Sequence, residues 1–108
     1  MHDTFLVHIR NNIPLDFPHE EKALLMSMEA DKADELVRQG VITCIFRVVG
    51  RRENVGVWRA SSSQELHDVL TSLPMYPHLD ITVTPLAAHP CWPGLNHDSS
   101  TATEAESA

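Results

Sequence analysis

A chain of 108 residues, 43% of them apolar, has the size of one small domain with a single modest hydrophobic core. The formal net charge of -7 and the total of only eight Lys and Arg residues argue against nucleic acid as a partner. No apolar run approaches the roughly 18 residues that span a bilayer, and the first residues lack the pattern of a signal peptide. We therefore expect a cytoplasmic protein without a membrane partner.

The two cysteines are predicted to be free thiols. Cys44 lies in an apolar, strand-like run and Cys91 in a proline-rich segment, without C-x-x-C spacing. The seven histidines do not suggest a metal site either, because no two of them have the i, i+4 or H-x-H spacing that puts two ligands on one face. The sequence therefore predicts no metal.

The first half of the chain predicts a strand followed by a long helix. Residues 4–10 alternate apolar and polar side chains with period two, as a strand does. Residues 11–18 contain two prolines and end the strand. Residues 19–39 are rich in Ala, Leu, Met, Glu and Lys, which favour a helix, and Gly40 stands where a left-handed residue commonly ends one.

Three more strands and a second helix are predicted in the rest of the chain. Residues 41–49 are almost continuously apolar and β-branched, residues 50–54 predict a loop, and residues 55–60 predict a strand that completes a hairpin. Ser62 and Glu65 have the spacing of a capping box, and the helix that they begin ends before Pro74 and Pro77. Residues 79–84 alternate again as the last strand.

The resulting order, β-α-β-β-α-β, predicts a ferredoxin-like α+β fold with a four-stranded antiparallel sheet and both helices on one face. We expect this single domain to span residues 1–90. Residues 91–108 have no periodicity and are expected to form a tail that is flexible or lies over a neighbouring subunit.

The alternation also assigns side chains to the two faces of the sheet. The face toward the helices is predicted to carry Phe5, Val7, Ile9, Val55, Val57, Ile81 and Val83. The opposite face is predicted to carry Leu6, His8, Asn54, Trp58, Asp80 and Thr82. Because this second face is mixed in polarity, with Trp58 at its middle, we expect another subunit to dock there.

Glu29 is the candidate general acid and base. At 100° per residue it falls on the apolar stripe of the long helix, between Leu25 and Ala33. Burial of a carboxylate raises its pKa toward the range in which it can take up and return a proton near neutral pH. The alternative is that Glu29 forms an ion pair with Lys32 or with an arginine of the sheet.

Several residues that are ordinary one by one occur in an order and spacing typical of a known family. They are Met28-Glu29-Ala30, Gly40, Phe46-Arg47, Gly50, Asn54 and residues 65–86, where a short helix passes through a Pro-aromatic-Pro corner into a strand. Over residues 4–90 the chain resembles the muconolactone isomerase family, small enzymes that move a double bond within an unsaturated lactone during bacterial aromatic catabolism. The resemblance implies the ferredoxin-like fold and assembly into a closed homo-oligomeric ring such as a decamer.

The resemblance also implies roles for individual residues. Glu29 would be catalytic, because the family's helix carries a glutamate at this point. Arg47 and Asn54, which are also matched, would lie at the substrate. Arg51 has no family counterpart, but as a basic residue it would add positive charge at the hairpin. The alternatives are an exposed charge or a partner of Glu29 for Arg47, a turn residue for Asn54 and a solvated loop residue for Arg51.

His67 and Tyr76 complete the candidate substrate-binding set. His67 has a family counterpart, and histidines titrate near neutral pH, which suits a proton shuttle; a structural hydrogen-bonding role is the alternative. Tyr76 lies between two prolines where the family has an aromatic residue, and it would shape a wall of the pocket. A proton shift by one carboxylate needs no cofactor.

Two segments depart from the family pattern. Residues 41–45 replace aromatic, basic and histidine side chains with apolar ones, and Arg51-Arg52 replaces a His-Tyr pair. A related isomerase, dehalogenase or cyclase that acts on a less polar ring is therefore an alternative, which a pocket lined mainly by Ile42, Cys44 and Phe46 would favour. A non-catalytic binding subunit is the second alternative, because this fold hosts many functions. A closed ion pair of the helix glutamate would favour it.

Overall fold

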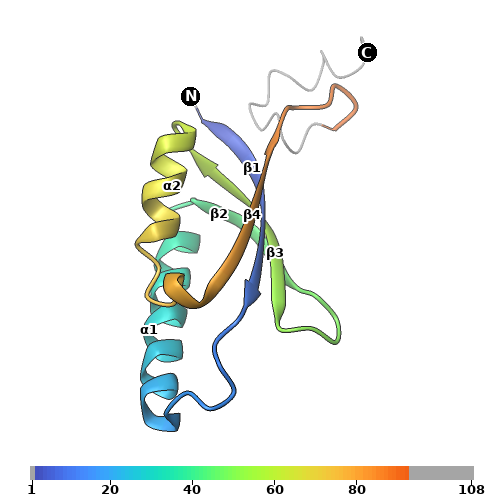
Figure 1. Cartoon of the computed structure of the whole chain (residues 1–108). Helices are drawn as coiled ribbons and strands as arrows, with labels where there is room; N and C mark the ends of the chain where they lie inside the picture. Colours follow the sequence, from blue (N-terminus) through green and yellow to red (C-terminus); the bar gives the residue numbers. More distant parts are fainter. Residues whose placement is uncertain (1, 93–108) are drawn as a thin grey trace.

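The computed structural model describes residues 2–92. Its elements in chain order are β1 (Asp3–Asn11), α1 (His19–Arg38), β2 (Ile42–Arg47), β3 (Glu53–Ala60), α2 (Ser63–Thr71), a short 3-10 turn (Tyr76–His78) and β4 (Leu79–Leu86). The strands form one antiparallel sheet in the order β2-β3-β1-β4. Figure 1 shows both helices on the same face of this sheet. The predicted ferredoxin-like α+β fold is confirmed.

The hydrophobic core is concentrated under α2 and the C-terminal end of α1. Phe5 and Val7 of β1 are buried there together with Leu66 and Leu70 of α2. The long helix contributes one fully buried residue, Leu36, from near its end. The N-terminal part of α1 is therefore held over the sheet without closing a second core beneath it.

The end of α1 follows the sequence prediction, whereas its apolar stripe does not close against the sheet. Gly40 has φ +78°, and its N–H donates to the carbonyl of Val37, so the helix ends in the expected left-handed glycine. On the side of the helix that carries Glu29, however, Met26 remains 45% exposed. Space between this side of the helix and the sheet explains the exposure.

The two faces of β3 are reversed relative to the prediction. Trp58 is 1% exposed and pairs with Phe5 of β1 and Ile42 of β2, so it lies under the helices and not on the open face. Asn54 shares this helix-facing side, whereas the valines of β3 face away. The prediction was wrong because both faces of β3 carry apolar side chains, and a period-two pattern then fits either orientation.

The open face of the sheet therefore carries the valines of β3 at its centre in place of Trp58. Leu6 pairs with Val57, and Val55 pairs with Phe46, which is 64% exposed. Cys44 pairs with Val57 from the other side. These residues form a continuous apolar area on the face that carries no helix.

An irregularity in β2 decides which of its side chains point toward the helices. The pairing with β3 shifts between Ile42 and Cys44, so that Ile42 pairs with Trp58 and Ile45 with Gly56. Residues an odd number apart would lie on opposite sides of a regular strand, but the bulge puts both isoleucines on the helix-facing side. Gly56 permits the close approach, since a Cβ there would lie 2.5 Å from the Cys44 carbonyl oxygen.

The second helix begins with the predicted cap. The Ser62 hydroxyl accepts a hydrogen bond from the Glu65 N–H at 3.1 Å, while the Glu65 carboxylate turns back to the N–H and hydroxyl of Ser61. Both cysteines are free, as predicted. Across residues 2–92 no helix is long and apolar enough to cross a membrane. The predicted tail lies outside the described residues from position 93 onward.

Candidate functional site

A cavity of about 450 Å³ lies between α1 and the sheet, where the helix contributes no fully buried residue. Its walls come from α1, the helix-facing side of the sheet, the β2–β3 hairpin and the segment between α2 and β4. The apolar lining includes Met26 and Ala33 of α1, Ile42 and Ile45 of β2, and Met75. This volume is ordinary for a site that binds a small organic molecule.

Glu29 reaches the cavity from the middle of α1. Its Oε1 accepts a hydrogen bond of 3.0 Å from the backbone N–H of Met75, in the segment before β4. Burial raises the pKa of Glu29 above the ordinary range of a glutamate, and the bond from Met75 opposes this rise without cancelling it. Among the described residues Glu29 makes no ion pair, and Lys32 approaches Glu35 instead. The arrangement gives a fixed carboxylate that can hold or release a proton.

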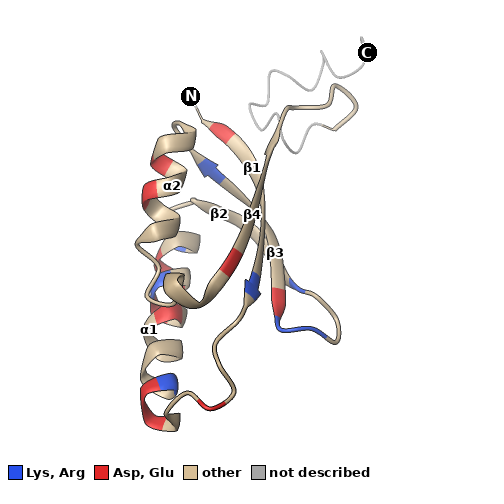
Figure 2. Cartoon of the chain, in the orientation of Figure 1, with Lys and Arg blue, Asp and Glu red and all other residues tan. Residues whose placement is uncertain are grey.

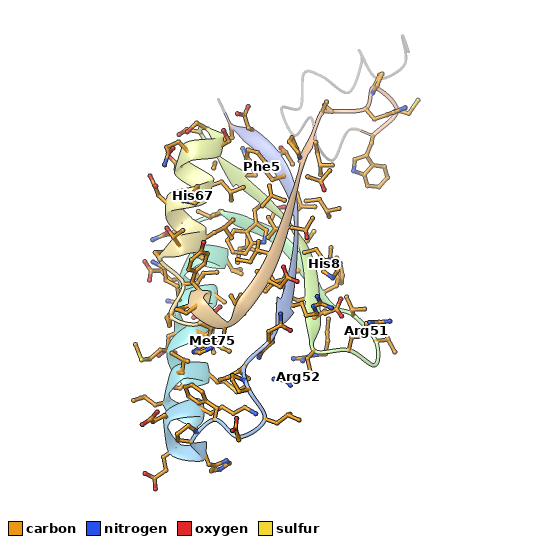
Figure 3. All side chains as sticks on the ribbon, viewed as in Figure 1. Phe5, His8, Arg51, Arg52, His67 and Met75 are labelled. Carbon is orange, nitrogen blue, oxygen red and sulfur yellow. The ribbon has the colours of Figure 1, made fainter. Side chains whose placement is uncertain are left out.

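Four basic side chains also line the cavity. Figure 2 shows the basic residues of the hairpin beyond the sheet end, and Figure 3 places Arg51 and Arg52 there. Arg51 lies 3.5 Å from Glu53, and Arg52 donates to Asn11 and to the Ile13 carbonyl, each at 3.5 Å. These two arginines therefore already have partners within the chain.

The other two basic side chains are Lys22 and Arg47. Within residues 2–92 neither makes an ion pair or a side-chain hydrogen bond, although both line the cavity. Lys22 precedes Glu29 by seven residues, two turns earlier on the same side of α1. An anionic ligand group is the natural partner for charges placed in this way.

Glu53 balances part of this positive charge at the edge of the cavity. Its carboxylate contacts Nε2 of His8 at 2.7 Å as well as Arg51. The hydrogen bond with His8 and the charge of Arg51 lower the pKa of Glu53. Glu53 is therefore an ionised partner that orients Arg51 rather than a proton carrier.

Two polar side chains of β3 reach the cavity wall without a hydrogen-bond partner. Oδ1 of Asn54 and Nε1 of Trp58 are both buried and unpaired, and both residues line the cavity. Asn54 pairs in register with Arg47, so it lies toward the hairpin, and Trp58 lies four residues farther along β3. Buried polar groups are rarely left unpaired, and a bound ligand or water is the usual explanation.

The structure brings together some of the predicted site residues and not others. Glu29, Arg47, Asn54 and Arg51 all line the cavity. His67 is exposed on α2, far from the arginine hairpin in Figure 3, and Tyr76 is also outside the lining. Among residues 2–92 no group of His, Cys, Asp and Glu side chains is arranged to hold a metal ion.

Lys22, Trp58 and Met75 are among the lining residues that were not predicted to belong to the site. The sequence does carry a signal for Lys22 as a site residue, because its seven-residue spacing from Glu29 puts both residues on one side of a helix. Trp58 was assigned to the wrong face of β3. Met75 acts through its backbone N–H, for which the sequence carries no signal.

Comparison with known proteins agrees with this fold. A model of the family described as muconolactone delta-isomerase matches residues 4–91. The chain belongs to the muconolactone delta-isomerase family. A muconolactone delta-isomerase of Cupriavidus pinatubonensis is 36% identical over 86 residues, which cover 80% of this chain and 94% of that protein.

Other members of the family give the same result. Muconolactone delta-isomerase 1 of Acinetobacter lwoffii is 37% identical over 87 residues, covering 79% of this chain and 91% of its own. A crystal structure of muconolactone isomerase superposes with a TM-score of 0.78 at 31% identity, over 82% of this chain and 93% of that one. The resemblance to this family that the sequence indicated is confirmed, and the relatives named above are isomerases.

Proposed function

We propose that this protein is a cofactor-independent isomerase that moves a C=C bond within an unsaturated lactone of the muconolactone type. The observation that carries the proposal is the carboxylate of Glu29, which borders a cavity of about 450 Å³ and makes no ion pair in the described part of the chain. The names of the relatives support the same reaction.

Glu29 is proposed to move the proton in both steps. Its carboxylate removes a proton from a carbon that the lactone carbonyl acidifies, and the electron pair of that C–H bond passes into a dienolate. The resulting carboxylic acid returns the proton to another carbon of the dienolate, so the double bond has moved and the enzyme is regenerated. Because Met75 holds Oε1, the other oxygen is available to the substrate, and the raised pKa suits both directions of transfer.

The remaining walls are proposed to orient the substrate. Lys22 and Arg47 are available to bind a carboxylate on the lactone, and Arg51 strengthens the positive field beside them. The side chains of Ile42 and Ile45 cover the ring and keep water from the dienolate. This arrangement gives a neutral ring and a charged substituent different surroundings in one cavity.

The test is turnover of muconolactone by the wild type, by Glu29→Gln and by Glu21→Gln, followed by absorbance. Glu21 is an exposed glutamate in the first turn of α1 and serves as the matched control. We expect Glu29→Gln to lose at least about a hundredfold in kcat, and Glu21→Gln to remain active. No turnover by the wild type would reject this substrate, and equal turnover by all three would remove Glu29 as the base.

The alternative functions find less support in the cavity. The lining includes Ile42 but not Cys44 or Phe46, which lie on the open face, so the lining expected for a less polar ring substrate is not present. A non-catalytic subunit gives no physical reason for a carboxylate that borders a cavity without an ion pair, as Glu29 does.

We also propose that the protein is a cytoplasmic homo-oligomer that assembles through the open face. The apolar area that Leu6, Val55, Val57 and Phe46 form there supports this proposal, because monomers seldom leave such an area to water. Sedimentation velocity of the wild type and of Phe46→Asp tests it. A wild type that sediments as a monomer would reject it.

A further inference from the structure

The lining of the cavity changes from basic to apolar along its length. On α1 the lining runs from Lys22 to Ala33, and on β2 it runs from Arg47 back to Ile42. Because a short turn joins α1 to β2, the two elements run in opposite directions, and Arg47 lies toward Lys22. Figure 1 shows the start of α1 and the β2–β3 hairpin at one end of the molecule and α2 at the other. Leu73, just after α2, joins Ala33 and Ile42 in what we call the apolar end of the cavity.

Glu29 lies between the basic and the apolar ends of the cavity. At a rise of about 1.5 Å per residue, it is about 10 Å from Lys22 and about 6 Å from Ala33 along the axis of α1. A lactone with its carboxylate at Lys22 and Arg47 and its reacting carbons at Glu29 therefore directs the other side of its ring toward the apolar end. That side is opposite the carbon that carries the acetate group.

The cavity is larger than the unsubstituted lactone needs. Muconolactone has about ten non-hydrogen atoms, and even at the volume of about 30 Å³ that a water molecule takes up in the liquid they fill only about 300 Å³. The cavity of about 450 Å³ therefore retains about 150 Å³, the difference between 450 and 300 Å³. Because a dry apolar cavity of about 150 Å³ holds benzene, this space has room for a group of about four to six carbons.

Water is a poor occupant for the apolar end. The side chains of Ala33, Ile42 and Leu73 offer no hydrogen-bonding group, whereas an ordered water needs about two to four polar partners. Leaving the space empty costs stability, because the side chains around it lose contacts. Ala33 lies about one turn before the buried Leu36, where a larger side chain would close the space. An apolar group of the ligand is therefore the occupant that fits.

We propose that the substrate is an alkyl-substituted lactone, whose alkyl group of about four or five carbons occupies the apolar end of the cavity. This inference rests on the proposed lactone isomerase function and names its substrate class. The alkyl group is on the ring carbon next to the carbonyl. Glu29 removes the proton of the carbon that carries the acetate group, and the dienolate takes that proton back on the alkyl-bearing carbon. Ala33 is thus a specificity-determining residue.

The binding experiment uses two saturated γ-lactones, which cannot isomerise. Both carry an acetate side chain of the same configuration, and one also carries an n-butyl group on the carbon next to the carbonyl. Their dissociation constants are measured by calorimetry. Burial of each methylene group strengthens binding by up to about fourfold, so we expect the butyl lactone to bind the wild type at least about thirtyfold more tightly than the unsubstituted lactone.

Two variants locate the butyl group within the protein. Ala33→Leu adds three carbons at the apolar end, and Ala23→Leu adds the same carbons at an exposed position of α1 outside the cavity lining. We expect Ala33→Leu to lower the preference for the butyl lactone by about tenfold or more, because the added side chain occupies the same space. Ala23→Leu should retain the preference. Urea unfolding should show Ala33→Leu to be at least as stable as the wild type, since leucine fills the space.

The outcomes separate the alkyl site from the function that it rests on. Equal affinity of the wild type for the two lactones, or no binding of either, would overturn the alkyl site. A preference that persists in Ala33→Leu would also overturn it, because the butyl group would then bind elsewhere. Failure of the proposed function shows instead as absent turnover of both muconolactone and its butyl derivative. A butyl preference that Ala33→Leu removes and Ala23→Leu retains supports the alkyl site, with or without turnover.

Discussion

Gly56→Ala should destabilise the protein and weaken substrate binding, although position 56 is not among the residues that line the cavity. A Cβ at Gly56 would lie 2.5 Å from the Cys44 carbonyl oxygen and 3.2 Å from the Cα of Ile45, whereas ordinary contacts begin at 3.4 Å. Both obstacles are backbone atoms or are fixed by the backbone, so no side-chain rotation relieves them. Strand β2 must therefore move by about 0.9 Å, the difference between 3.4 and 2.5 Å.

This displacement of β2 should lower the free energy of unfolding. Overpacking of a closed interior typically costs about 1–3 kcal/mol, and we expect about 2 kcal/mol for Gly56→Ala. In a domain of this size that corresponds to a fall in Tm of about 10 °C. Because Ile45 and Arg47 follow the clash along β2 and both line the cavity, the shift should also raise KM more than it lowers kcat.

Urea unfolding and steady-state kinetics check the expectation, at one fixed protein concentration in case the protein assembles. Thr82→Ala, an exposed position on β4, is the control and should stay within about 0.5 kcal/mol of the wild type. A Gly56→Ala variant as stable as this control would show that β2 and β3 are not in the close contact described. A destabilised variant with unchanged KM would refute the link from the bulge to the cavity.

Two further predictions concern the charges of the cavity. Because burial raises the pKa of Glu29 in the folded state, its contribution to stability is fully present below the unfolded pKa of about 4.3 and is lost as pH rises through the folded value. Urea unfolding should therefore show that Glu29→Gln gains stability relative to the wild type as pH rises, and that the difference becomes constant above the folded pKa of Glu29. Wild-type kcat/KM should fall as pH drops through this raised pKa. A stability difference that does not depend on pH would contradict this account. Lys22→Met and Arg47→Met should each raise KM for an anionic lactone about tenfold or more. Lys32→Met, outside the cavity lining, should not, and equal effects in all three would point to long-range charge alone.

The order of the elements was predictable because each local signal agreed with the others. Three local predictions are confirmed by the structure: the strand in residues 4–10, the left-handed glycine at position 40 and the Ser62 cap. The position of Glu29 on the inner side of α1 followed from helical periodicity alone. These features depend on neighbours within one turn or one strand, which a single sequence contains.

The features that could not be predicted correctly from the sequence depend on contacts between strands. The bulge between Ile42 and Cys44 puts Ile45 and Arg47 at the cavity, and nothing within β2 itself indicates where an extra residue is inserted. The reversed face of β3 has the same origin, because Gly56 must meet the bulge and Trp58 then falls under the helices. Tertiary packing thus decided what hydrophobic alternation left undetermined.

The positions of the core and the cavity separate stability from chemistry along the length of α1. Leu36, near the helix end, is buried in the core with α2, whereas Glu29 and Lys22 extend over a space that the protein leaves unfilled. Filling that space with larger apolar side chains would bury more surface and stabilise the fold, but it would remove the room for a ligand. Trp58 lies at the boundary, because it belongs to the core cluster and is also among the residues that line the cavity. The boundary between the two regions is therefore where substitutions should change stability and substrate affinity in opposite directions.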